Sequence, residues 1–143
     1  MSLHYLTEHE TRSLLELPLY LATVQAGFPS PADDYMDKRL DLNEHLIKHD
    51  AATFYCRVSG NSMEGAGIHD GDLLIVDRAV EPKNGHIVVA TVDGEMACKI
   101  LDTHNKQLLS ANPNYAPISI GEDSELCVEG VVIHSIRSHV RAG

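Results

Sequence analysis

The sequence predicts a mainly β protein: a body of antiparallel strands, preceded by a short helix and an extended N-terminal arm. Two observations predict this class, and a third limits the number of domains. From residue 53 onward, short β-branched runs alternate with glycine-containing turns. Asp93-Gly94 joins two such runs directly, which is a strong hairpin signal. The chain has 143 residues, 43% of them hydrophobic, which suits one self-sufficient core and excludes two large domains.

An arm is expected at the N-terminus, over residues 1–26. Its leucine-rich run at 8–21 contains Pro18, which breaks a helix where the helix would bury its apolar face. We therefore expect at most short helical turns in this arm.

A connector and a helix are expected over residues 27–48. Gly27 and the prolines that follow it favour an extended linker. Ser30 then offers a capping side chain, and a proline and two aspartates occupy the first turn. This pattern predicts a helix that runs to about residue 48, and it allows an interruption near Asp41.

The β-rich body is expected over residues 49–143. Asp70-Gly71 and Asn84-Gly85 mark two further tight turns within it. The candidate strands are TFYCRV (53–58), DLLIVD (72–77), HIVVATV (86–92), EMACKIL (95–101), KQLLS (106–110) and LCVEGVVIHSI (126–136).

Charge and cysteine content exclude several classes of protein. The chain has eleven Lys and Arg and 21 Asp and Glu, a net charge of -10. The excess of acidic residues is divided evenly along the chain, so neither half of it is basic, which argues against an autonomous DNA-binding protein. It does not argue against a partner that holds DNA. Cys56, Cys98 and Cys127 have no CxxC spacing, so we expect small core residues in a reducing compartment. No signal or membrane-spanning segment is apparent, and a cytoplasmic protein is expected.

Ser62 is the first candidate for chemistry. It lies in SGNSMEGAGIHDGD (59–72), where glycines and polar residues would hold a serine on a turn with backbone amides around it. That arrangement suits a nucleophile, because amides can stabilise an oxyanion. Residue type alone favours an ordinary turn serine in a polar loop. The motif is not the G-x-S-x-G elbow of hydrolases, because Glu64 stands at its last position.

The nine histidines offer no marked partner for that serine. His45 and His49 lie four residues apart, but without a third ligand nearby an exposed pair is favoured over a zinc site. His69 and His86 are next to turns and are expected at the surface.

Lys99 is the second candidate, because it stands inside the apolar run of residues 96–101. A lysine in a strand ordinarily points to solvent. If it points inward, burial lowers its pKa from about 10.4, and the neutral amine could take the proton of Ser62. Ser/Lys pairing is a known variant of serine catalysis. Spacing alone does not show that the two residues meet.

At SGNSM (59–63), GDLLIVD (71–77) and CKI (98–100), the sequence closely resembles the LexA/UmuD family of self-cleaving serine peptidases. The resemblance covers nearly the whole chain. LexA carries an N-terminal helix-turn-helix domain, for which about 26 residues leave no room, so the repressor function is not expected. The segments that resemble the UmuD branch are FPSPADDYMDKRLDLNEHLI (28–47), GDLLIVDRAV (71–80), ATVDGE (90–95), NPNYAPI (112–118) and GVVIHSI (130–136).

The resemblance implies a site residue by residue. Ser62 resembles the nucleophile, Lys99 the general base, and Ala26-Gly27 the scissile bond. Glycine after the bond imposes no Cβ barrier on a kinked, extended segment. Backbone amides near Asn61 and Ser62 would stabilise the oxyanion. Two positions depart from the pattern: Ala26 stands where UmuD proteins can have cysteine, and Asn61 where an acid can appear.

The resemblance also implies a biological role. It implies a homodimer of the SOS response whose arm, residues 1–26, is removed by self-cleavage when RecA filaments on single-stranded DNA promote it. The shortened chain would join a UmuC-type subunit as part of an error-prone translesion polymerase. No cofactor or metal is expected. The alternatives are a polymerase-binding module with a vestigial peptidase site, and a zinc or redox protein, for which the ligand spacings are missing.

Overall fold

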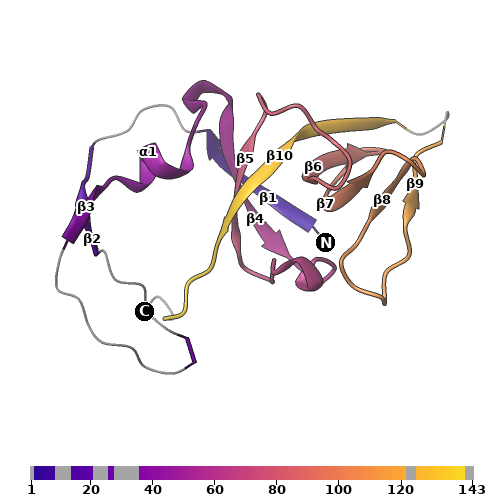
Figure 1. The fold of residues 1–143 in the computed structure, drawn as a ribbon. Helices are drawn as coiled ribbons and strands as arrows, with labels where there is room; N and C mark the ends of the chain where they lie inside the picture. Colours follow the sequence, from indigo (N-terminus) through magenta and orange to yellow (C-terminus); the bar gives the residue numbers. More distant parts are fainter. Residues whose placement is uncertain (1, 9–13, 21–25, 28–35, 122–124, 141–143) are drawn as a thin grey trace. The chain divides into compact units, whose positions relative to one another are not determined.

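The computed structural model describes residues 2–8, 14–20, 26–27, 36–121 and 125–140. The chain divides into two compact units (Figure 1). Unit 1 comprises Met1–Glu10 and His49–Gly143, and unit 2 comprises Thr11–Lys48. The expected boundary at residue 26, where the arm would be cleaved off, and the one at residue 48, before the β-rich body, stay predictions.

Unit 1 is an eight-stranded sheet in the order β1-β4-β5-β10-β6-β7-β8-β9. Adjacent strands in this order are antiparallel, so the predicted mainly β class is confirmed. The strands are β1 (Ser2–Glu8), β4 (Thr53–Ser59), β5 (Leu73–Asp77), β6 (Ile87–Val92), β7 (Glu95–Asp102), β8 (Gln107–Leu109), β9 (Ile118–Ser119) and β10 (Leu126–Ile136).

The local turn signals correspond to observed turns. Asp93 and Gly94 have φ values of 49° and 86° and join β6 to β7 as a two-residue hairpin. Gly71 and Gly85, at φ values of 87° and 88°, close the other two predicted turns. The six predicted strands correspond closely to β4, β5, β6, β7, β8 and β10.

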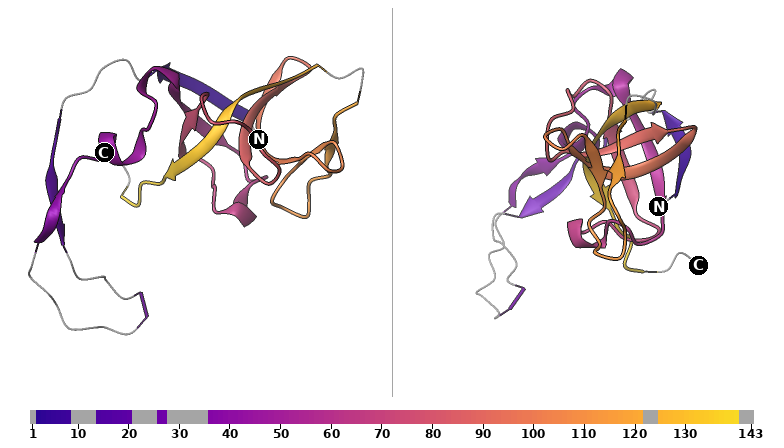
Figure 2. Two further views of the ribbon diagram at one scale, coloured as in Figure 1. Left: turned by 45° about the horizontal axis from the view of Figure 1, so that its top comes forward. Right: turned by 90° about the vertical axis from the view of Figure 1, so that its right-hand side faces the viewer.

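β10 joins the two halves of this sheet. Its first half pairs with β6 and its second half with β5, so it crosses unit 1 from one half to the other (Figures 1 and 2). A shift in the pairing register between Val128 and Gly130 bends β10 at this point. Glycine is required there because a Cβ on Gly130 would lie 2.7 Å from Val76 Cγ1.

Two clusters of buried side chains form the core of unit 1. The larger contains Phe54, Cys56, Val58, Met63, Ile68, Leu74, Val76, Val89 and Cys98, and the smaller contains Val88, Ala90, Leu101, Leu108 and Val131. Cys56 and Cys98 are therefore core residues, as predicted. Cys127 is exposed, so the prediction was wrong for that residue. It lies on β10 between Leu126 and Val128, which pack against the smaller cluster, so its own side chain is on the opposite face of the strand.

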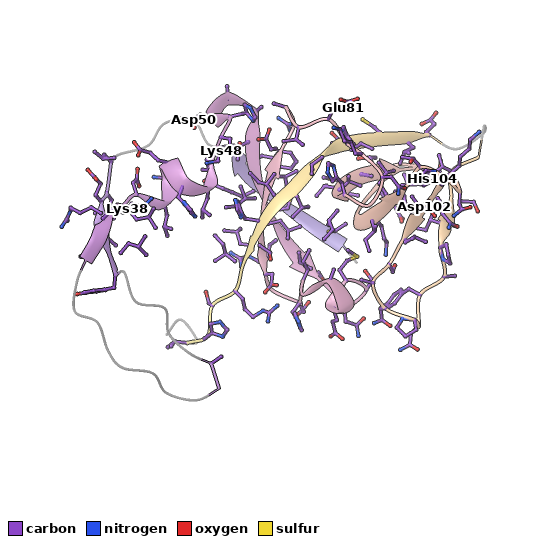
Figure 3. All side chains as sticks on the ribbon, viewed as in Figure 1. Lys38, Lys48, Asp50, Glu81, Asp102 and His104 are labelled. Atoms are coloured by element: carbon purple, nitrogen blue, oxygen red, sulfur yellow. The ribbon has the colours of Figure 1, made fainter. Side chains whose placement is uncertain are left out.

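The helix prediction for unit 2 was largely wrong. β2 (Leu17–Tyr20) pairs with β3 (Met36–Leu40), and Lys38 lies on this second strand (Figure 3). In the described part of unit 2, helix occurs only in α1 (Leu42–Leu46). This helix begins after Asp41, whose side chain accepts a hydrogen bond from the Asn43 amide. The predicted start of the helix, residues 28–35, lies outside the described residues.

The arm also differs from the short helical turns expected. Pro18 lies within β2, opposite Arg39, and a two-stranded ladder tolerates proline because both strands are edges. β1 pairs with the free edge of β4. Such pairing is decided by a partner about 50 residues away in the chain, which local patterns do not reveal.

Candidate active site

Ser62 lies in the loop that leaves β4, directly before the short 3-10 helix η2 (Glu64–Ala66). Gly60, at φ 98°, turns the chain, and its amide donates to Asp70 Oδ1 at 2.7 Å across the loop. This closes the loop on itself and places the Ser62 side chain inward, at 0% exposure. An ordinary turn serine would face solvent, so burial favours a specific role for this hydroxyl.

Lys99 lies on β7, opposite Val88 of β6, and is 5% exposed. Its Nζ donates to Ser62 Oγ at 3.2 Å, a contact between residues 37 positions apart. The inward orientation, which sequence reasoning left open, is the one observed. The structure therefore brings the two candidate residues into hydrogen-bonding distance.

The surroundings of Lys99 favour its neutral form. Burial lowers the pKa of Lys99 below its ordinary value, while the adjacent Cys98 acts in the opposite direction. Burial also raises the pKa of Cys98 to about 12, so its thiol is uncharged at neutral pH and leaves the lysine without a thiolate partner. A neutral amine at this distance can accept the proton of a serine hydroxyl and make it a nucleophile.

Ser110 is a second hydroxyl at this site, and sequence reasoning missed it. Lys99 Nζ donates to Ser110 Oγ at 2.7 Å, a shorter contact than the one to Ser62. Ser110 follows β8, which pairs with β7 and so runs beside the strand that carries the lysine. No motif in the sequence marks it, because a serine at the end of a short strand is common.

The residues after Ser110 contact the Ser62 loop. Asn112 Nδ2 donates to the Asn61 carbonyl at 3.0 Å, and Tyr115 Oη donates to Asn61 Oδ1 at 2.7 Å. The ring of Tyr115 also lies 5.5 Å from Lys99 Nζ. Sequence reasoning noted this segment only as part of the NPNYAPI resemblance, so these contacts to Asn61 were not anticipated.

The other expected site residues lie as follows. Within the described ranges, no residue accepts a hydrogen bond from the backbone amides of Asn61 and Ser62. Ala26 and Gly27 lie in unit 2, in an exposed bend, and a Cβ on Gly27 would contact nothing within 4 Å.

A pocket of about 510 Å³ extends along β7 and reaches Lys99. This volume is within the range of ligand-binding pockets in proteins. Its lining residues are Val92, Asp93, Glu95, Met96, Ala97, Lys99 and Ile118.

Among the described residues, no histidine side chain is hydrogen-bonded to Ser62 or Lys99. His49 Nδ1 lies 2.6 Å from Asp77 Oδ2, which is an ion pair when the ring is protonated. His104 lies near Asp102 at the β7–β8 turn (Figure 3). Among the residues that the structure describes, no three His, Cys, Asp or Glu side chains gather as a metal site. In the same ranges, no helix has the length and apolar character needed to cross a bilayer.

Comparison with known proteins gives consistent matches. A family model described as Peptidase S24-like matches residues 18–133. Protein ImpA of Salmonella typhimurium is 46% identical over 125 residues, which are 83% of this chain and 82% of ImpA. Protein MucA of Escherichia coli is 42% identical over 125 residues, 86% of each chain. The LexA repressor of Bordetella avium is 36% identical over 129 residues, 89% of this chain and 60% of the repressor.

Proposed function

Because the chain belongs to the S24-like peptidase family, we propose that it is a serine peptidase that cleaves its own Ala26-Gly27 bond with Ser62 and Lys99. The matches confirm the resemblance to the LexA/UmuD family that the sequence predicted. One observation carries the proposal: the buried Lys99 Nζ lies 3.2 Å from the buried Ser62 Oγ.

The reaction follows from this contact. Neutral Lys99 takes the proton of Ser62 as Oγ attacks the Ala26 carbonyl carbon, and an oxyanion forms. The C–N bond to Gly27 then breaks, and the Lys99 ammonium returns the proton to the leaving amine. Water, deprotonated by Lys99, then attacks the Ala26 carbonyl carbon; the C–O bond to Ser62 breaks, and the Lys99 ammonium returns the proton to Ser62 Oγ. The products are residues 1–26 with a new carboxylate and residues 27–143 with a new amino terminus.

Two further features support this assignment. Among the described residues none accepts a hydrogen bond from the backbone amides of Asn61 and Ser62, so these amides can donate to the oxyanion, which forms beside the nucleophile. The pocket along β7 provides an extended surface that ends at the base, as a peptide on the acyl side of the bond needs. Because enzyme and substrate are one chain or one dimer, holding the peptide in place supplies a large effective molarity.

The wider role follows from the relatives. The similarity to ImpA, MucA and LexA supports a function in the SOS response and in mutagenesis. We propose that RecA filaments on single-stranded DNA promote cleavage of a cytoplasmic homodimer. The processed chain would then serve a UmuC-type subunit in an error-prone translesion polymerase. No cofactor or metal takes part in these steps.

The test is the intact mass of the full chain over time, at neutral pH and at about pH 10, where more lysine is neutral. Wild type should break between Ala26 and Gly27, faster at high pH, while Ser62→Ala and Lys99→Ala should stay whole. Ser119→Ala and Lys83→Ala change exposed residues of the same types and should cleave as wild type does.

If wild type stays whole at both pH values and also with RecA filaments, the peptidase assignment is wrong. The vestigial-site alternative, a module that only binds a polymerase subunit, then replaces it. Cleavage by Lys99→Ala at the wild-type rate would likewise remove the lysine from the mechanism.

A further inference from the structure

A lysine that acts as a base must be oriented as well as neutral. A neutral amine has two N–H groups and one lone pair, and only the lone pair can take a proton from Ser62. An amine free to rotate would direct an N–H at the serine for much of the time. The orientation of Lys99 therefore depends on which groups accept its N–H bonds.

Among the described residues, two side chains lie within hydrogen-bonding distance of Lys99 Nζ, Ser62 at 3.2 Å and Ser110 at 2.7 Å. The neighbours on the same face of β7, Ala97 and Leu101, carry no polar side-chain atom. Ser110 is thus the closer acceptor, and the longer contact to Ser62 is the one left for proton transfer.

The backbone around Ser110 is attached to the loop that carries the nucleophile. The next carbonyl, of Ala111, accepts a hydrogen bond from the Gly65 amide at 2.7 Å. One residue further, Asn112 Nδ2 donates to the Asn61 carbonyl at 3.0 Å. These two bonds hold Ser110 at a set position relative to Ser62, so its hydroxyl can orient the lysine that lies between them.

We propose that Ser110 is the positioning residue of the general base: its Oγ accepts a hydrogen bond from Lys99 Nζ and so directs the lone pair of the neutral amine at Ser62 Oγ. This inference rests on the proposed function, because it assigns a role within that reaction. Ser110 itself exchanges no proton with the substrate.

A hydrogen bond in the opposite direction, from the Ser110 hydroxyl to the Lys99 amine, would have the opposite effect on the reaction. If the Ser110 hydroxyl donated to the amine, it would occupy the lone pair and slow the reaction. Other ionisable groups also face this region: Cys98 beside the lysine, Tyr115 over it, and Asp93 and Glu95 along the pocket. All of them are unchanged in variants of Ser110, so such variants isolate its hydroxyl.

The test compares Ser110→Thr with Ser110→Val in the full chain. These side chains have nearly the same shape, but only threonine keeps the hydroxyl, and valine leaves little space for a replacing water. Cleavage rates are measured from neutral to alkaline pH. On the alkaline plateau Lys99 is neutral in every variant, so a lower plateau reports orientation rather than charge.

We expect Ser110→Val to lower the plateau rate about tenfold, which is what one lost orienting hydrogen bond amounts to. Ser110→Thr should restore most of the rate. The midpoint of the valine profile should also shift to lower pH, because an acceptor that stabilises the ammonium is gone. A purely structural role would slow both variants alike and leave the midpoint unchanged. That result, or a valine variant as fast as wild type or faster, would overturn the proposal.

A second measurement separates this inference from the proposed function. In Ser62→Ala protein, which cannot cleave, lysine labelled with ¹³C at Cε reports the titration of Lys99 by NMR. Adding Ser110→Val should lower its midpoint, and adding Ser110→Thr should leave it near the parent value. An unchanged midpoint refutes the contact whether or not wild type cleaves. If the midpoint shifts but wild type never cleaves, the contact is real and the catalytic role of both residues is refuted.

Discussion

Gly65 lies against the segment that carries Ser110, and its replacement by alanine tests how closely this contact is packed. A Cβ built on Gly65 would lie 2.6 Å from the Ala111 carbonyl oxygen, whereas ordinary contacts begin at 3.4 Å. The two atoms must therefore separate by about 0.8 Å, the difference between these distances. The oxygen in question is backbone and accepts the Gly65 amide at 2.7 Å, so the strain has no flexible side chain to absorb it.

The net effect is a sum of opposing contributions. Overpacking a close contact costs about 1–3 kcal/mol. Stretching the hydrogen bond to its limit costs about 1 kcal/mol more. Against this, alanine restricts the unfolded chain and stabilises by about 0.4–1 kcal/mol, because Gly65 does not have a positive φ that alanine would strain. The cost of the clash exceeds the entropic gain, so we expect Gly65→Ala to lower the free energy of unfolding by about 1–3 kcal/mol.

The assay is urea unfolding followed by circular dichroism, because the chain has no tryptophan. It uses the Ser62→Ala background, so that cleavage cannot occur, and one fixed protein concentration, so that association contributes equally. Gly27→Ala is the matched control, since a Cβ there contacts nothing within 4 Å. If the free energy of unfolding of Gly65→Ala is within about 0.5 kcal/mol of that of its parent, the packing argument is wrong.

Three further predictions concern charge and packing. Arg137 donates to both carboxylate oxygens of the buried Asp72 at 3.0 Å. Burial raises the pKa of Asp72, but the hydrogen bonds from Arg137 and the His69 amide outweigh burial and hold that pKa below its ordinary value. Stability from this pair is present above the unfolded carboxyl pKa of about 3.9 and is lost as pH falls through the lower folded value. Arg137→Ala should therefore lower the urea midpoint at neutral pH and make that midpoint fall less steeply as the pH is lowered. A midpoint that falls as steeply as in the parent protein would contradict this. Burial lowers the pKa of Lys99, so folding with Lys99 is penalised at neutral pH and less so as pH approaches about 10.4. Lys99→Met should therefore raise the urea midpoint of Ser62→Ala protein at neutral pH, and a gain that does not shrink at about pH 10 would be evidence against a perturbed lysine. Leu74→Ala leaves a cavity at a fully buried position and should lower the free energy of unfolding by about 2–5 kcal/mol. Leu42→Ala, at an exposed position, should lower it by less than about 0.5 kcal/mol. Calorimetry that finds equal losses of stability in the two variants would refute the core assignment.

Local chemistry explains why most of unit 1 was predictable. Asp93-Gly94 adopts the positive φ values that a two-residue hairpin needs, and few other dipeptides do so readily. The β-branched runs on either side can then pair without information from elsewhere in the chain. Unit 2 shows the opposite case. A helix start at Ser30-Pro31 satisfied every local rule, yet residues 36–40 pair with β2, because tertiary pairing overrides a weak local propensity.

The candidate site divides in the same way. Ser62 was identifiable because a serine among glycines and turn residues is locally unusual. The orientation of Lys99 was not, because residues 96–101 are otherwise apolar on both faces of the strand and the alternation that marks an inner face is missing. Ser110 had no local signal at all. Its importance comes from its place beside the lysine.

By itself, the sequence determined the β class, the turns, the acidic charge and the serine and lysine that could react. Only the tertiary structure decided that Lys99 points inward, that its Nζ lies 3.2 Å from Ser62 Oγ and that Ser110 is its closer partner. The physical reason is that reactivity here depends on burial and on distances between residues far apart in the chain. Burial lowers the pKa of the amine, and both quantities exist only once β7, β8 and the Ser62 loop have packed together.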